Sequence, residues 1–272
     1  MAGRERWVHA LLLLACLLVV FPMLWMLSTS LKPPPEIFAG TFHLWPDRPT
    51  LQNFATALTQ VPMLRLFCNS LVVALAVTAA QAVTSTLAAY ACAVLRVPGH
   101  RVWFALFVAT MMVPVQVTMI PNYLLIARLD LLNTYAGLIV PQVVTGYGIF
   151  MLRQTFKNMP ASLVEAGILD GATSWQILWR IVVPATRTAV AALSVLFFIN
   201  TWNQYLWPLL VATDKAVRTL PVGMQEFVSL EGGTNWGPLM AAATMAIVPA
   251  LAAYVVAQRW VLESFVTAGL KE

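Results

Sequence analysis

Charged residues are scarce in this chain of 272 residues. Asp, Glu, Lys and Arg together make up 10% of it, against 60% hydrophobic residues, whereas soluble domains carry about 25% charged residues. This shortage excludes an ordinary soluble enzyme, a disordered chain and a coiled coil, and it indicates that lipid is the main solvent. The excess of 16 basic over 11 acidic residues is therefore interpreted as membrane topology and not as affinity for nucleic acid.

Motifs for metal binding, nucleotide binding and hydrolysis are also missing. The three cysteines and three histidines are scattered at spacings that fit no metal site. The sequence contains no G-x-x-x-x-G-K-[ST], no H-E-x-x-H and no G-x-S-x-G. It also has no carboxylate or histidine inside an apolar run that would serve as a proton relay. We therefore expect no catalytic or metal-binding residue and no cofactor in this chain.

Six long apolar runs are present, at about 10–30, 67–93, 102–124, 135–152, 188–212 and 239–258. As a helix, each approaches or exceeds the length of about 20 residues that crosses a bilayer core. None has a charged residue in its central portion. The sequence therefore predicts an all-α integral membrane protein with six spans. A cleaved signal peptide is the alternative for the first run, but that run is longer than the usual apolar stretch of about 7–15 residues.

The basic residues predict the orientation of these spans. With the N-terminus inside, ten basic residues fall on the inner side: Arg4, Arg6, Arg96, Arg101, Arg153, Lys157, Arg180, Arg187, Arg259 and Lys271. Six fall on the outer side: Lys32, Arg48, Arg65, Arg128, Lys215 and Arg218. Because basic loops stay on the cytoplasmic side, both termini are predicted to be cytoplasmic.

Prolines interrupt the predicted spans, at positions 22, 114, 121, 141, 208 and 249. A broken helix is tolerated in lipid only where protein or a water-filled cavity satisfies the freed carbonyl groups. The sequence therefore predicts kinked helices. Two interpretations stay open: the kinks surround a translocation pathway, or they only serve packing.

The longest inner connection, about 153–187, is too polar to span a membrane and carries helix signals. Pro160 suits the first position of a helix. Glu165 lies early in that helix, where the helix dipole favours a carboxylate. Gly171 can end the helix in a left-handed conformation.

A second short helix is predicted to follow directly. Thr173 and Gln176 have the spacing of a capping box, and Pro184 is predicted to end the helix. Its apolar residues recur at helical spacing and are predicted to form one stripe: Trp175, Leu178, Trp179 and Val182. Such a helix pair either docks on a partner protein or lies on the bilayer surface with its tryptophans as anchors.

The same loop resembles a known motif. Glu165-Ala166-Gly167-Ile168-Leu169-Asp170-Gly171, followed by Ile181-Val182-Val183-Pro184, is similar to the EAA loop of ABC importer permeases. That loop reads Glu-Ala-Ala, three residues, Gly, nine residues, Ile-x-Leu-Pro. This sequence departs from it at two positions, with Gly167 for the second Ala and Val183 for Leu.

Other segments narrow the resemblance to the carbohydrate-type permeases. They are Phe150-Met151-Leu152-Arg153-Gln154, Asn133-Thr134-Tyr135 and Asp170-Gly171-Ala172. The runs 202–209, Trp-Asn-Gln-Tyr-Leu-Trp-Pro-Leu, and 112–117, Met-Val-Pro-Val-Gln-Val, look most like the glycerol-3-phosphate branch. The resemblance covers nearly the whole chain.

The resemblance implies a type I ABC importer permease fold with six transmembrane helices. Residues 1–272 would form a single permease domain with a cytoplasmic coupling loop at 153–187. The residues implied to couple to an ATPase are Glu165, Ala166, Gly167, Asp170, Gly171, Ile181 and Pro184. The chain would not be an enzyme but would move a sugar or a glycerol-3-phosphate-like polyol across the inner membrane of a prokaryote.

The resemblance also implies partners. They are a second homologous permease, two ATPase subunits that bind ATP and Mg²⁺, and an extracytoplasmic solute-binding protein, with the lipid bilayer around the permease. No nucleic acid is expected to bind.

Uncharged polar residues inside the predicted spans are the candidates for solute contact. Asn200, Asn203, Gln204 and Trp207 are spaced to share one helical face, and Gln81 and Gln116 add further carboxamides. Amides beside an aromatic ring suit a hydroxyl-rich solute. The alternatives are hydrogen bonds between helices and, for the tryptophan, an interfacial aromatic belt.

Two other classes of protein stay open as alternatives. An ion-coupled secondary transporter would favour an ionisable residue inside a span, and the sequence has none. A membrane-embedded transferase would need acidic or histidine residues at the bilayer surface, where Asp130 and Asp214 stand alone. No Lys or Arg lies within a span, so a partner permease would have to supply positive charge for an anionic solute.

Overall fold

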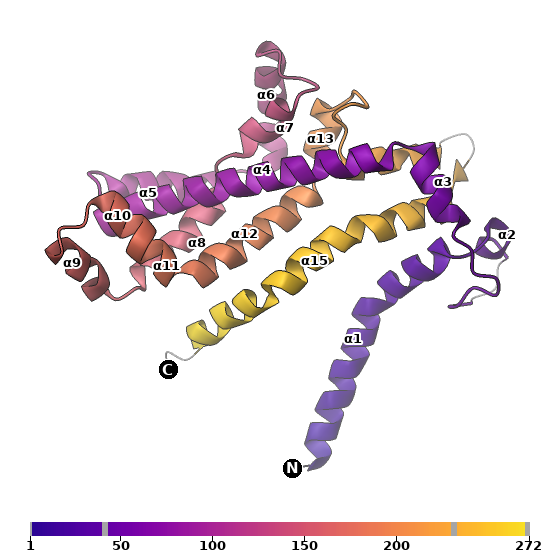
Figure 1. Ribbon diagram of the computed structural model, residues 1–272, viewed down its shortest axis with the longest axis horizontal. Coiled ribbons are helices and arrows are strands. Elements are labelled where there is room, and N and C mark those ends of the chain that lie inside the picture. Colours follow the sequence, from indigo (N-terminus) through magenta and orange to yellow (C-terminus); the bar gives the residue numbers. More distant parts are fainter. Residues whose placement is uncertain (1, 40–42, 230–232, 270–272) are drawn as a thin grey trace. The chain divides into compact units, whose positions relative to one another are not determined.

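The computed structural model describes residues 2–39, 43–229 and 233–269, and it is almost entirely helical (Figure 1). The chain divides into two compact units. Unit 1 comprises residues 1–67 and 220–248, and unit 2 comprises residues 68–219 and 249–272. Each unit is described by itself.

Unit 1 combines the N-terminal helices with a later segment that contains a small hairpin. Its elements are α1 (Ala2–Ser30), α2 (Pro34–Ile37), α3 (Gln52–Gln60), the start of α4 (Met63–Tyr90), α14 (Leu220–Gly223), the 3-10 helix η4 (Met224–Phe227), β1 (Val228–Ser229), β2 (Gly233–Thr234) and the start of α15 (Trp236–Gly269). The two strands pair antiparallel, with Val228 opposite Thr234. Pro22 and Pro249 lie inside α1 and α15 without ending them.

The buried side chain of Asn53 in α3 ties the end of α1 to the loop that follows it. Its amide nitrogen donates to the carbonyl oxygens of Ser30 and Lys32, at 2.9 and 2.8 Å. Lys32 is also buried, with its ammonium group hydrogen-bonded to the His43 carbonyl and 4.8 Å from the centre of the Trp25 ring. This lysine therefore stabilises the loop and offers little surface to solvent.

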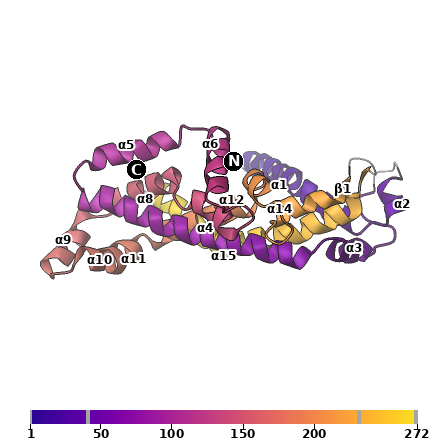
Figure 2. The same ribbon diagram turned by 90° about the horizontal axis from the view of Figure 1, so that it is seen from above.

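Unit 2 contains the rest of α4, the rest of α15 from Pro249 on, and a series of shorter helices. They are the π-helix η1 (Ala91–Leu95), α5 (His100–Thr110), α6 (Val115–Arg128), α7 (Tyr135–Ile139), the 3-10 helix η2 (Val140–Gln142), α8 (Gly146–Lys157), α9 (Ala161–Leu169), α10 (Ser174–Ile177), the π-helix η3 (Leu178–Val182), α11 (Val183–Ala185), α12 (Arg187–Trp202) and α13 (Leu206–Val211). Figures 1 and 2 both place α9 to α11 at one end of this unit.

By length and composition, three helical segments of the described chain suffice to cross a membrane. They are Glu5–Ser30, Met63–Leu95 and Trp236–Val256. Three bent pairs pass the same test: His100–Thr110 with Val115–Arg128, Tyr135–Gln142 with Gly146–Lys157, and Ser174–Ala185 with Arg187–Trp202. If each pair is one span, the number reaches six, which is the number that the sequence predicts. The third pair differs in position, because Ser174–Ala185 lies within the predicted cytoplasmic loop at 153–187.

The spans differ from the sequence prediction at their breaks. The third apolar run bends by 97° at residues 111–114, where Pro114 caps the start of α6. The fourth bends by 45° after Pro141. The prediction of one continuous span at 188–212 is wrong, because α12 ends at Trp202 and α13 begins at Leu206. The kinks that proline predicts at 114 and 141 are thus confirmed, while the break at 203–205 lies before its proline.

Helix α4 satisfies the backbone groups freed at the second break. Gln81 donates from its amide to the Gln142 carbonyl, and Thr84 donates from its hydroxyl to the Val143 carbonyl, each at 2.7 Å. Gly146 begins the next helix against the end of α5, where an added Cβ would lie 2.5 Å from the Phe107 carbonyl oxygen. Protein groups therefore satisfy the carbonyls that a broken helix exposes.

Candidate functional sites

The coupling segment, residues 158–186, begins with helix α9, which presents several residues of the motif to solvent. Glu165 and Ala166 are exposed, and so is Asp170 at the end of the helix. Leu169 is 88% exposed and Ile168 59%. Neither carboxylate forms an ion pair with another residue of the described chain. Ile168 and Leu169 are adjacent exposed apolar residues, and contiguous exposed apolar surface is typical of an interaction site.

The turn after α9 has the geometry of a Schellman motif. Gly171 has a φ of +74°. Its N–H donates to the Ile168 carbonyl at 3.0 Å, and the N–H of Ala172 donates to the Gly167 carbonyl at 2.9 Å. These are the two hydrogen bonds that define this helix end. The prediction that Gly171 ends the helix in a left-handed conformation is confirmed. Pro160, however, is the N-cap residue and not the first helical residue.

The second helix starts as the sequence predicts and continues differently. Thr173 and Gln176 form the capping box in both directions. The backbone then widens into the π-helix η3, which ends at Val182, and the helical segment continues to Ala185, one residue past Pro184. Pro184 therefore does not end the helix, because its ring at an early position of α11 is compatible with helical backbone.

The four apolar residues of this helix do not form one stripe, contrary to the prediction. Leu178 and Val182 are buried, whereas Trp175 is 62% exposed and Trp179 38%. The two tryptophan rings pack edge to face, with centroids 5.6 Å apart. The wider π-turn changes the angular spacing between residues, so a pattern based on 3.6 residues per turn fails here. The exposed pair belongs to the outer surface of the coupling segment.

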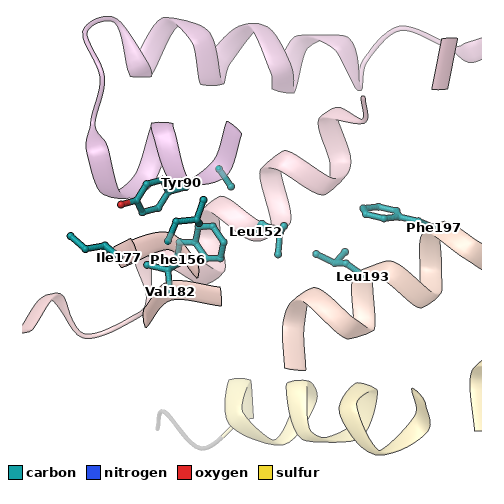
Figure 3. Close-up of a cluster of buried hydrophobic side chains, with 9 residues drawn as sticks. Tyr90, Leu152, Phe156, Ile177, Val182, Leu193 and Phe197 are labelled. Carbon is teal, nitrogen blue, oxygen red and sulfur yellow. The ribbon is translucent and has the colours of Figure 1, made fainter. Parts of the chain in front are cut away.

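An apolar cluster, the inner cluster, holds the coupling segment against the rest of unit 2 (Figure 3). It consists of Ala89, Tyr90, Leu152, Phe156, Ile177, Leu178, Val182, Leu193 and Phe197, which come from α4, α8, α10, η3 and α12. Gly167 connects α9 to this group, since an added Cβ would lie 2.5 Å from Ile181 Cδ1. The predicted coupling residues Gly167 and Ile181 therefore pack inward, while Glu165, Ala166, Asp170 and Pro184 are exposed.

The predicted solute-contact residues are not brought together on one helical face. The helix ends before Asn203, whose amide nitrogen donates to the Ile199 carbonyl at 2.9 Å. Trp207 is buried in a second apolar cluster, and its ring N–H donates to the Gly137 carbonyl at 3.2 Å. It therefore supports packing. Asn200 and Gln116 are exposed.

Gln204 is the predicted solute-contact residue that has a buried polar atom without a hydrogen bond. Its side-chain oxygen is buried and accepts no hydrogen bond from the described residues. Gln81, by contrast, uses its amide nitrogen to support the broken helix. An unsatisfied buried oxygen costs about 1–3 kcal/mol, so it needs an explanation such as a water molecule or a solute.

Three residues of α4 that the sequence did not single out as site residues make contacts to distant parts of unit 2. Tyr90 donates from its hydroxyl to the Ser174 carbonyl, and Thr84 donates to the Val143 carbonyl. Asn69 is buried and donates to the carbonyls of Ala216 and Arg218, while its side-chain oxygen accepts from the Tyr135 hydroxyl at 2.6 Å. The sequence signal that could have identified these three residues is that each is a polar residue within an apolar run.

Comparison with a family profile matches residues 81–265 to the binding-protein-dependent transport system inner membrane component family. This range includes the coupling segment and the broken helices. The match thus covers more than half of the chain.

Two relatives and one solved structure extend the comparison to nearly the full length. The permease protein UgpE of an sn-glycerol-3-phosphate transport system from Rhizobium meliloti (strain 1021) is 35% identical over 266 residues, which cover 95% of this chain and 94% of the relative. UgpE of Yersinia enterocolitica is 32% identical over 97% of this chain and 96% of its own. The crystal structure of a bacterial ABC transporter that imports the acidic polysaccharide alginate has a TM-score of 0.84 at 22% identity, covering 95% of this chain and 97% of that one.

Proposed function

Because this chain belongs to the binding-protein-dependent transport system inner membrane component family, we propose that it imports sn-glycerol 3-phosphate or a closely related polyol. The chain is a multi-pass permease subunit of an ABC importer of the inner membrane. It is a transporter component and not an enzyme, which excludes the secondary transporter and the membrane-embedded transferase. The observation that supports the solute is the 35% identity to a glycerol-3-phosphate permease over 95% of this chain.

The family implies an ATPase and a binding protein as partners. The finer assembly is our proposal: a second homologous permease beside this one, two ATPase subunits that bind ATP and Mg²⁺, and both termini in the cytoplasm. The coupling segment then faces the ATPase. Its exposed carboxylates and its exposed Leu169 and Trp175 provide the mixed polar and apolar surface that a protein partner buries.

Recognition of the phosphate group of sn-glycerol 3-phosphate requires positively charged side chains, and the predicted spans of this chain contain none of them. Among the described residues, one charged side chain is buried, that of Lys32. Its ammonium group already contacts the His43 carbonyl and the Trp25 ring. We therefore assign phosphate recognition to the partner permease. Gln204 of this chain would contact the hydroxyl groups.

The ligand of the binding protein tests the proposed solute. In the assembled complex, binding protein loaded with sn-glycerol 3-phosphate is expected to stimulate ATP hydrolysis. The same binding protein incubated with maltose is expected to leave hydrolysis at its basal rate. Stimulation by maltose alone would assign the chain to a sugar importer instead.

Accessibility of single cysteines tests the proposed orientation. In a cysteine-free background, Thr234→Cys is expected to react with a membrane-impermeant maleimide added to intact cells. Ser174→Cys is expected to react only after the membrane is opened. Ten of the 16 basic residues lie on the side assigned to the cytoplasm. Labelling of Ser174→Cys from outside would contradict this topology.

Replacement of Gln204 by leucine is expected to change stability and transport in opposite directions. Removing a buried oxygen that has no partner should raise the unfolding temperature of the complex, because an unsatisfied polar group is costly. Transport should fall about tenfold or more, because a site that hydrogen-bonds a solute hydroxyl loses that contact.

The neighbouring substitution Asn203→Leu is the matched comparison. It removes a hydrogen bond at the end of α12 and should lower stability. Full transport by Gln204→Leu would show that this oxygen does not contact the solute.

A further inference from the structure

Helix α4 makes polar contacts with three other segments of unit 2, spaced along its length. Tyr90 contacts the coupling segment, Thr84 and Gln81 contact the break between α7 and α8, and Asn69 contacts the loop after α13. Each contact joins a side chain of α4 to a backbone carbonyl. Because the acceptor is a backbone group, a side-chain substitution in the contacted segment does not remove it. The side chains of α4 therefore determine whether these hydrogen bonds can form.

The contact at Tyr90 joins α4 to the coupling segment directly. The tyrosine hydroxyl lies 2.8 Å from the carbonyl oxygen of Ser174, the first residue of α10. Tyr90 is only 4% exposed, and its ring packs in the inner cluster beside Phe156, Ile177 and Val182 (Figure 3). The apolar neighbours fix the position of the Tyr90 ring, whereas Ser174 is exposed, so the hydrogen bond itself is partly buried.

Both partners of this bond precede a π-helix. Tyr90 is the last residue of α4 before η1, and Ser174 begins the one-turn helix that precedes η3. A π-turn replaces the regular i→i−4 hydrogen bonds of the backbone and is a common place for a helix to adjust. The hydrogen bond between Tyr90 and Ser174 therefore joins the end of α4 to the start of α10, next to the two π-helices, where the backbone is less constrained.

The contact at Asn69 lies at the other end of the same helix. Twenty-one residues separate Asn69 from Tyr90, which is about 32 Å of α-helix, close to the thickness of the hydrocarbon core. Asn69 holds the loop at Ala216 and Arg218, and Tyr135 holds Asn69. A displacement of α4 along its axis would therefore act at once on the coupling segment, the helix break and this outer loop.

We propose that α4 transmits the movement of the coupling segment to the loop at 213–218, and that Tyr90 is the positioning residue that engages it. This inference rests on the proposed docking of the coupling segment on an ATPase. Tyr90 touches neither solute nor nucleotide in this arrangement. It acts through the Ser174 carbonyl, so that the coupling segment and α4 move as one body.

Tyr90→Phe tests the proposal, because it removes the hydroxyl and keeps the packed ring. The complex is reconstituted in lipid with its ATPase, native cysteines are replaced by serine, and Ala216→Cys reports on the outer loop. Ala216 is exposed, and its backbone carbonyl is the group that Asn69 holds. The rate of labelling by an impermeant maleimide is measured with and without a non-hydrolysable ATP analogue.

The analogue is expected to change the labelling rate in the parent complex. In Tyr90→Phe, that change should shrink by about two- to tenfold, the factor that one net hydrogen bond contributes to an equilibrium constant. The amount of bound ATPase should stay as in the parent. Tyr123→Phe is the matched control, because Tyr123 is a half-buried tyrosine beside the second apolar cluster.

Two results of the labelling experiment would overturn the proposal. One is a full response in Tyr90→Phe, which would leave Tyr90 as a packing residue even if the unfolding temperature falls. The other is no response of Ala216→Cys in the parent. Loss of bound ATPase in Tyr90→Phe would also contradict it, since Tyr90 would then serve docking. Failure of the docking proposal is detected separately, as wild-type binding and wild-type stimulation of the ATPase in complexes with Glu165→Lys and with Gly171→Val.

Discussion

A complex that carries Glu165→Lys is expected to lose its ATPase during purification, or to keep it without stimulation by loaded binding protein. Glu165 is exposed on α9 and has no ion-pair partner in the described part of this chain. Its carboxylate is therefore free to accept hydrogen bonds from a partner, and reversing the charge places lysine against any basic group of the cleft. Stimulated hydrolysis should fall about tenfold or more, as for like charges at an interface.

Gly171→Val is expected to produce the same loss by a different route. The φ of +74° at Gly171 costs a residue with a β-carbon about 1–2 kcal/mol, and a β-branched residue is a stronger outlier. The turn would then shift α9 relative to α10, although the space around Gly171 is open, with nothing within 4 Å of an added Cβ. Gly171→Ala should therefore show an intermediate loss.

The measurement is the same for all of these variants. The complex is purified through a tag on this chain, bound ATPase is quantified, and its hydrolysis is followed with and without loaded binding protein. Glu165→Gln is the matched control for charge, since it keeps the size and the acceptor oxygen. Wild-type binding and stimulation in both Glu165→Lys and Gly171→Val would refute docking and favour the membrane-surface interpretation of the coupling segment.

Gly137→Ala is expected to destabilise unit 2 strongly, although it adds a single methyl group. The added Cβ would lie 2.2 Å from the Leu131 carbonyl oxygen and 3.1 Å from Val211 Cγ1. The nearest atom belongs to the backbone, so no side-chain rotation relieves the clash. Overpacking of this kind costs about 1–3 kcal/mol or more, and the Gly137 carbonyl that accepts from Trp207 would be displaced as well.

Gly167→Ala makes the same chemical change in a different environment. There the nearest atom, at 2.5 Å, is Ile181 Cδ1, the end of a flexible side chain. Alanine is also the residue of the EAA pattern at this position. The unfolding temperature of the purified complex should thus fall sharply for Gly137→Ala and little for Gly167→Ala. Equal effects of the two variants would show that backbone contact at Gly137 does not limit the packing of α7.

The local structure of the coupling segment could be predicted from the sequence because its signals act over a few residues. The Thr173–Gln176 capping box and the left-handed Gly171 both form as predicted. Each depends on hydrogen bonds to backbone groups within five positions, so distant parts of the chain have little influence. The π-helix η3 is the exception: the sequence did not predict it, and it packs against α9 and contributes to the inner cluster.

The sequence also determined that this is a membrane protein and where its apolar runs lie. Composition alone decides whether a helix is stable in lipid, and the proline positions predict the bends at 114 and 141. The break at 203–205 was not predictable in this way. Its causes are the Asn203 cap and the burial of Trp207 on Gly137, and the second of these joins residues 70 positions apart.

What the polar residues within the spans do was decided only by the tertiary structure. A glutamine or tyrosine in an apolar run has the same sequence signature whether it contacts a solute or a backbone carbonyl. Gln81 binds the carbonyl of a residue 61 positions away, and Tyr90 one 84 positions away, so both acceptors exist only once the helices pack. The sequence by itself therefore determined that this chain is a membrane permease, and it predicts the coupling loop. The packing of the broken helices determined which polar groups support the backbone. It also determined which buried oxygens, that of Gln204 among them, have no partner among the described residues, because hydrogen-bond satisfaction depends on distance in space and not on position in the chain.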